Sequence, residues 1–213
     1  MLELVIPSLL QTLYMVFFST LFSLVLGFPM GILLVITEKG SIWEKPAFYR
    51  LLDGIINVLR SFPFLILMIL LFPLSRLIVG KTIGTTATIV PLSIAAAPFV
   101  ARVIESSLKE VDRGVIELGN SIGASVPQII FRILIPEAMP SLIMGVTLTI
   151  INLIGYSAMA GAIGGGGLGD LAIRYGLYRF QTDIMVVSVI IIVLLVQGIQ
   201  YVGNRLASKI SKK

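Results

Sequence analysis

Long stretches without charge alternate with short charged segments along this chain. Residues 4–37, 82–101 and 138–169 contain no Asp, Glu, Lys or Arg. A helix needs about 20 mostly apolar residues to cross the hydrocarbon core of a bilayer, and each of these stretches supplies them. Two further apolar stretches, 55–77 and 184–204, are also long enough to cross. The pattern therefore predicts five membrane-spanning helices.

We expect an all-α integral membrane protein with one domain over residues 8–201, because no polar segment is long enough to build a separate soluble core. No Lys or Arg precedes the first apolar stretch, so a cleaved secretory signal is not expected. The predicted spans lie at about 10–36, 55–77, 82–101, 140–166 and 184–204, with a cytoplasmic insert at 105–137.

The composition agrees with this fold class and narrows the chemistry. The 213 residues are 57% hydrophobic and 13% charged, with a mean hydropathy of +1.03, whereas a soluble domain carries about 25% charged residues. The sequence has no Cys and no His, which excludes disulfides, thiolate chemistry, imidazole metal ligands and a Ser-His-Asp triad. We therefore do not expect an enzyme, a cofactor or a metal.

Lys and Arg are divided unequally between the segments that connect the spans. Of 16 such residues, eleven fall in the loop 38–50, the segment 102–137 and the C-terminal tail, and four in the links that alternate with these. Cytoplasmic loops are enriched in Lys and Arg, so the N-terminus is predicted to be outside and the C-terminus cytoplasmic. Asp53 and Arg60 are then expected to anchor the second span at the interface. Because the net charge of +5 is spread over short loops, no nucleic-acid partner is expected.

The insert is patterned as two short amphipathic helices joined at Gly123. The first carries an apolar stripe, and Gly123 stands where a left-handed helix end is expected. Ser125 with Gln128 three residues later matches a capping box at the start of the second helix, and Pro136 is expected to end it. An ordinary capped loop between two spans is the alternative. The stripe of the first helix consists of Val111, Val115, Leu118 and Ile122.

The same segment resembles the EAA---G---------I-LP signature of permease subunits in bacterial ATP-binding-cassette importers. Glu117 and Gly123 keep their places, whereas Leu118 and Gly119 replace the two alanines, and Ile135 replaces the leucine before Pro136. The resemblance implies that the insert is a socket for a separate ATPase subunit. The residues expected to make this coupling surface are Glu117, Leu118, Gly119, Gly123, Ala124, Ile133 and Pro136.

Three longer segments resemble the permeases of methionine importers. They are LRSFPFLILMILLFPLSRLIVGKTIG at 59–84, IVPLSIAAAPFVARVIESSLKEV at 89–111 and LIGYSAMAGAIGGGGLGDLAIRYGL at 153–177. The resemblance implies a type I importer fold in the bacterial inner membrane, and the import of L- and D-methionine. It also implies a complex of two permease chains with two ATPase chains, fed by a lipid-anchored binding protein and surrounded by membrane lipid.

Polar residues in the fourth span mark a candidate translocation path. Asn152, Tyr156 and Met159 recur at helical spacing, with Ser157 beside them, and polar residues within spans usually face a bundle interior or an aqueous cavity. We expect this face to line the path, with Met159 as an adaptable gate. The alternative is helix packing, because Ser157, Gly161 and Gly165 fit a small-xxx-small pattern.

The glycine run GGGGLG at 164–169 matches the spacing of a dinucleotide-binding fingerprint, and Asp183 follows at the distance of the acidic partner. That fingerprint needs a strand before it and a helix after it, whereas this run ends a predicted span. We therefore expect close helix packing or a flexible outer segment instead.

Other functions remain open from the sequence. The same machinery could import another amino acid or small solute. A small self-sufficient channel would need a filter or a charged ring, which the sequence does not supply. A scaffold without a transport role would leave the insert and the polar face unexplained.

Overall fold

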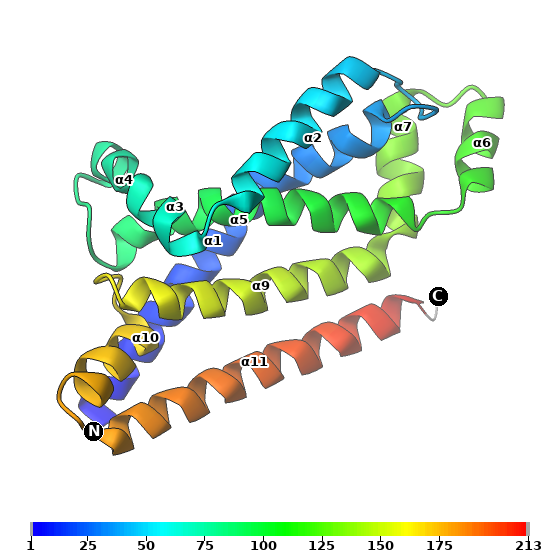
Figure 1. Ribbon diagram of the computed structural model, residues 1–213. Helices are drawn as coiled ribbons and strands as arrows, with labels where there is room; N and C mark the ends of the chain where they lie inside the picture. The colour runs from blue at the N-terminus through cyan, green and yellow to red at the C-terminus, as the bar shows by residue number, and fades with distance from the viewer. Residues whose placement is uncertain (1, 212–213) are drawn as a thin grey trace.

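The structure, a computed structural model, describes residues 2–211, and these contain helices and no strand. Four helices are long and apolar enough to cross a membrane: α1 (Leu2–Thr37), α5 (Thr85–Lys109), α9 (Met139–Gly161) and α11 (Thr182–Ser211). Figure 1 shows the N-terminus at one end of the bundle and the C-terminus toward the other. The expected all-α class is confirmed.

The segment expected to be a single second span is broken into three helices. They are α2 (Pro46–Ser61), α3 (Phe64–Leu70) and α4 (Phe72–Val79), and α2 and α3 meet at 102°. Phe62 at the break is extended, with φ −72° and ψ 133°, because Pro63 disfavours helical backbone in the residue before it. Residues 2–211 therefore hold five spans only if this bent pair counts as one.

Glycines bring α1 and α5 together. A Cβ built on Gly27 would lie 2.6 Å from the Val100 Cβ, and one on Gly31 would lie 2.6 Å from the Ile104 Cβ. Such distances are shorter than van der Waals contact, so only glycine lets the two helices approach this closely.

We predict that Gly31→Ala lowers the stability of the bundle, because overpacking at a close contact costs about 1–3 kcal/mol. Gly54 in α2 is the matched control, because no atom lies within 4 Å of a Cβ built there. Since Ala favours helix, Gly54→Ala should hold or raise the unfolding midpoint. Thermal unfolding in detergent compares the two variants, and equal midpoints would contradict the packing argument.

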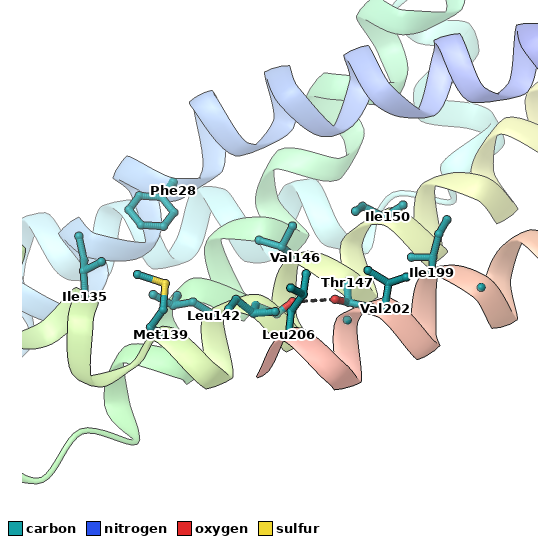
Figure 2. Close-up of a pocket in the computed structure, with 13 residues that line it drawn as sticks. Phe28, Ile135, Met139, Leu142, Val146, Thr147, Ile150, Ile199, Val202 and Leu206 are labelled. Carbon is teal, nitrogen blue, oxygen red and sulfur yellow. Dashed lines mark hydrogen bonds between the residues drawn. The ribbon is translucent and has the colours of Figure 1, made fainter. Parts of the chain in front are cut away.

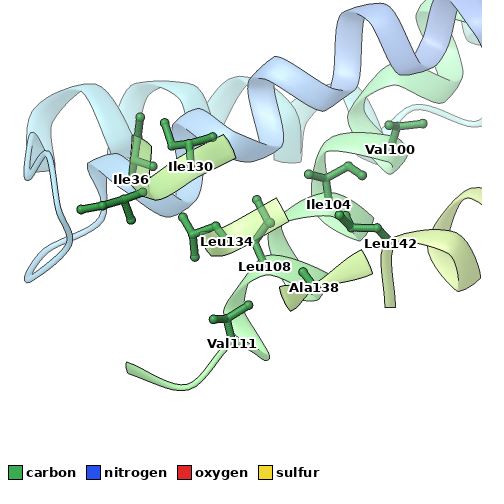
Figure 3. Close-up of a cluster of buried hydrophobic side chains, with 10 residues drawn as sticks. Ile36, Val100, Ile104, Leu108, Val111, Ile130, Leu134, Ala138 and Leu142 are labelled. Atoms are coloured by element: carbon green, nitrogen blue, oxygen red, sulfur yellow. The ribbon is translucent and has the colours of Figure 1, made fainter. Parts of the chain in front are cut away.

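A cluster of buried apolar side chains ties the insert to the ends of the long helices (Figure 3). Ile36 comes from α1, Ile104 and Leu108 from α5, and Leu134 from the second helix of the insert. Ile104 and Leu108 are at most 1% exposed. The root of the insert is therefore part of the core, so a displacement of the insert is transmitted to α1 and α5.

The insert contains α6 (Arg113–Ser121), α7 (Val126–Ile129), the π-helical η1 (Ile130–Leu134) and α8 (Ile135–Glu137). Gly123 has φ +77°, the left-handed conformation that the sequence predicts. The Ser125 N–H donates to Gln128 Oε1 at 2.8 Å, which is one half of the expected capping box.

The second helix of the insert ends at Glu137, one residue after Pro136, where the sequence predicts its end. The chain stays helical from Val126 to Glu137, and α9 begins at Met139 after a single turn residue. The π-helical turn before it closes with the Ile135 N–H bonded to Ile130 O. Pro136 then falls in the first turn of α8, where the missing N–H of proline is tolerated.

Candidate coupling insert and translocation face

The insert exposes an apolar surface. Leu118 is 64% exposed, Ile122 76% and Phe131 66%, and Val115 is more than one third exposed. We call these four residues the insert face. Figure 1 shows α6 and α7 at the extremity of the molecule, away from α10 (Gly167–Leu171). Clustered exposed apolar side chains mark contact surfaces. The expected stripe is only partly confirmed, because Val111 lies in the buried core instead.

Glycine closes the elbow between the two helices of the insert. Gly119 is buried, and a Cβ built on it would lie 2.7 Å from Ile133 Cδ1. The Ala124 N–H donates to Gly119 O at 3.0 Å, and the Gly123 N–H donates to Asn120 O at 3.0 Å. The structure thus brings together four of the signature positions. A methyl group at position 119 would require the flexible end of the Ile133 side chain to shift.

Glu117 lies on another side of α6 from the insert face. It is exposed and forms no ion pair within residues 2–211. With Asn120 and Arg113 it borders a cavity of about 440 Å³ that also meets the loop after α1. Pro136 is exposed at the far end of the insert. A carboxylate in this position is free to meet a basic group of another protein.

The candidate path residues on α9 separate into two groups. Met159 is 49% exposed, and the Tyr156 ring stacks on Phe64 of α3 with centroids 4.2 Å apart. Asn152 is half-buried. Ser157 is buried, and its hydroxyl donates to Ile154 O at 2.8 Å. Ser157 therefore favours the packing alternative, whereas Met159 is open to a neighbour or a solute.

The glycine run is held tightly rather than loose. A Cβ on Gly169 would lie 2.2 Å from Ala158 O, and one on Gly161 would lie 2.2 Å from the Asp170 N. The first helical N–H groups of α10 donate to side chains of α1: Gly167 to Gln11 Oε1 at 2.8 Å, and Leu168 to Thr12 Oγ1 at 2.9 Å. The packing reading of this segment is confirmed. Gln11 and Thr12 lie more than 150 positions away from these glycines, and no local sequence pattern points to them.

An apolar pocket of about 540 Å³ lies between α9 and α11 (Figure 2). Thr147 is the one lining residue with a polar side chain, and its hydroxyl donates to Ile143 O at 2.8 Å. A charged or zwitterionic solute needs partners for its charges. The side chains that line this pocket offer no such partner.

Residues 24–211 match the family of binding-protein-dependent transport system inner membrane components. The chain belongs to this family. It is 47% identical over 211 residues to the probable D-methionine transport system permease protein MetI of Vibrio cholerae, which covers 99% of this chain and 94% of that protein. The methionine import system permease protein MetP of Bacillus subtilis is 45% identical, over 85% of this chain and 82% of that protein.

Solved structures agree with this assignment. The native crystal form of the inward-facing MetNI methionine ABC transporter contains a chain with a TM-score of 0.97 at 41% identity, covering 99% of this chain and 97% of that chain. An amino acid ABC transporter reaches 0.79 at 19% identity, which supports the fold alone. The expected permease fold is confirmed, and this inner-membrane component is a transport subunit rather than an enzyme.

Proposed function

We propose that this chain is the permease subunit of an ATP-driven importer that carries methionine, in its L and D forms, into the cell. The observation that carries the proposal is the apolar insert face, which is set on a rigid elbow at one extremity of a membrane bundle. Nothing within the described chain covers Leu118 or Ile122. A transport component that presents such a surface requires a partner to cover it.

The partner we propose is an ABC ATPase, two copies of which meet two copies of this permease. The sequence contains no G-x-x-x-x-G-K-[ST] loop, so the hydrolysis of ATP falls to another chain. Glu117 and Gly123 are proposed to hold or contact that chain, together with Leu118, Gly119, Ala124, Ile133 and Pro136. A rigid element suits this role because rigid-body movement does not dissipate the displacement.

The solute and its delivery are inferred from the relatives. Proteins 45–47% identical to this chain carry names that specify D-methionine transport or methionine import. A lipid-anchored binding protein would deliver methionine to the outer side, where the N-terminus lies. Within the membrane, Asn152, Tyr156 and Met159 are proposed to line the path at the axis of the dimer, with Met159 as its gate.

Assembly tests the partner directly. The permease is expressed with the ATPase encoded beside its gene, and the mass of the purified complex is measured in a lipid nanodisc. Two permease and two ATPase chains are expected, with ATP hydrolysis stimulated by the loaded binding protein. A permease that purifies without any bound ATPase would overturn the proposal.

A further inference from the structure

A chain of ion pairs joins three helices beside the insert. Arg102 of α5 pairs through Nη2 with Asp53 of α2, and its Nη1 donates to Glu105 Oε2 at 2.7 Å. Lys109 Nζ lies 2.9 Å from Glu105 Oε1 and 3.0 Å from Glu38 Oε2, just after α1. We call these five residues the ion-pair chain. The sequence placed Asp53 at the membrane interface as an anchor, and its partner in α5 was not foreseen.

The centre of the ion-pair chain is buried. The Glu105 side chain is 7% exposed and that of Arg102 20%. Each Glu105 oxygen meets a different cation, so the buried carboxylate is fully paired. Arg102 Nη2 also donates to Asn57 Oδ1 at 2.8 Å, which gives α5 a second hold on α2. A buried ion pair adds little net stability, because the desolvation of both charges offsets much of their attraction.

The ion-pair chain lies between the insert and the candidate gate. Lys109 is the last residue of α5, and Asp112, the N-cap of α6, follows three positions later. At the other end, α2 runs through the 102° bend into α3. The first residue of α3 is Phe64, which stacks on Tyr156, three positions before Met159.

We propose that Arg102 is a positioning residue that makes α2 move with α5, so that displacement of the insert reaches the Phe64–Tyr156 contact beside Met159. The inference rests on the proposed function, because it assigns a role within ATP-coupled import. Without the pairing of Arg102 with Asp53, α5 would still follow the insert, but α2 and α3 would lag behind. The complex would then hydrolyse ATP with less import per ATP.

Asp53→Asn tests the link with little change in shape. The amount of methionine imported per ATP hydrolysed is expected to fall by about fivefold or more, the size of effect typical of a coupling residue, while ATP hydrolysis continues. Arg102→Lys keeps the positive charge, whereas Arg102→Gln removes it. The lysine variant should therefore retain more methionine import per ATP than the glutamine variant. Arg60→Gln is the control, because Arg60 lies exposed on the same helix and forms no ion pair within residues 2–211.

Spin labels report the linkage without reference to any solute. This chain has no cysteine, so within it labels attach only at Gly54→Cys in α2 and Ser106→Cys in α5. Position 54 has open space for a side chain, and Ser106 is exposed. The distribution of distances between the two labels should stay narrow with and without ATP. It should broaden when Asp53→Asn is added.

The outcomes of these two experiments decide whether Arg102 couples α2 to α5. An unchanged ratio and an unchanged label distance in Asp53→Asn would overturn the inference. Loss of the assembled complex would overturn it too, because the ion pairs would then be needed only for folding. If the unaltered complex imports no methionine, the proposed function fails. The label distances still decide in that case whether Arg102 couples α2 to α5.

Discussion

Leu118→Asp is expected to uncouple this permease from its ATPase. Leu118 is 64% exposed on the insert face, so the substitution leaves the folded chain intact while it places a charge in the proposed interface. Loss of an interface residue that carries much of the binding energy costs about 2–4 kcal/mol, which corresponds to roughly 30- to 1000-fold weaker binding. The affinity of the ATPase for the permease in nanodiscs measures this loss.

The matched control carries the same charge far from the insert. Tyr178 is 69% exposed in the segment between α10 and α11, so Tyr178→Asp should retain most of the affinity. If the two variants bind the ATPase equally well, the insert face is not the surface that meets it.

Met159→Ala is expected to open a leak. Met159 is half-exposed beside the stacked Tyr156 and Phe64 rings, and its long, adaptable side chain suits a closure that must yield to a solute. Its loss should raise ATP-independent methionine flux by about tenfold, which corresponds to a barrier lowered by about 1.4 kcal/mol. Efflux of labelled methionine from loaded vesicles without ATP measures the change.

A neighbouring residue of the same helix serves as the control for the gate. Ser157 is buried and its hydroxyl donates to its own helix. Vesicles with Ser157→Ala should therefore leak methionine no faster than vesicles with the unaltered permease. Equal leaks in the two variants, or none in Met159→Ala, would assign the closure of the path to other residues.

The features of this fold that depend on local sequence patterns are predicted correctly. The long helices follow from uncharged stretches, and the elbow at Gly123 follows from a glycine between two amphipathic patterns. The break before Pro63 could also have been predicted, because a proline inside an apolar stretch disfavours a continuous helix. Pro136 gave a similar signal, because the second helix of the insert ends one residue after it, at Glu137.

Contacts between segments that are far apart in the sequence could not be predicted from local patterns. Asp53 meets Arg102 across 49 positions, and Gly167 meets Gln11 across 156. Neither pair shows in the local pattern, because the first depends on how α2 packs on α5 and the second on how α10 packs on α1. The exposure of Leu118 was likewise invisible, since an apolar stripe is compatible with a core and with a contact surface.

Uptake of labelled methionine into proteoliposomes tests the central claim most directly. The vesicles hold this permease and its ATPase, with ATP inside and loaded binding protein outside. We predict that methionine accumulates only with ATP, and that accumulation is lost in the variant with Leu118→Asp. If methionine stays outside while ATP is hydrolysed in a permease-dependent manner, the assignment of methionine as the solute is contradicted.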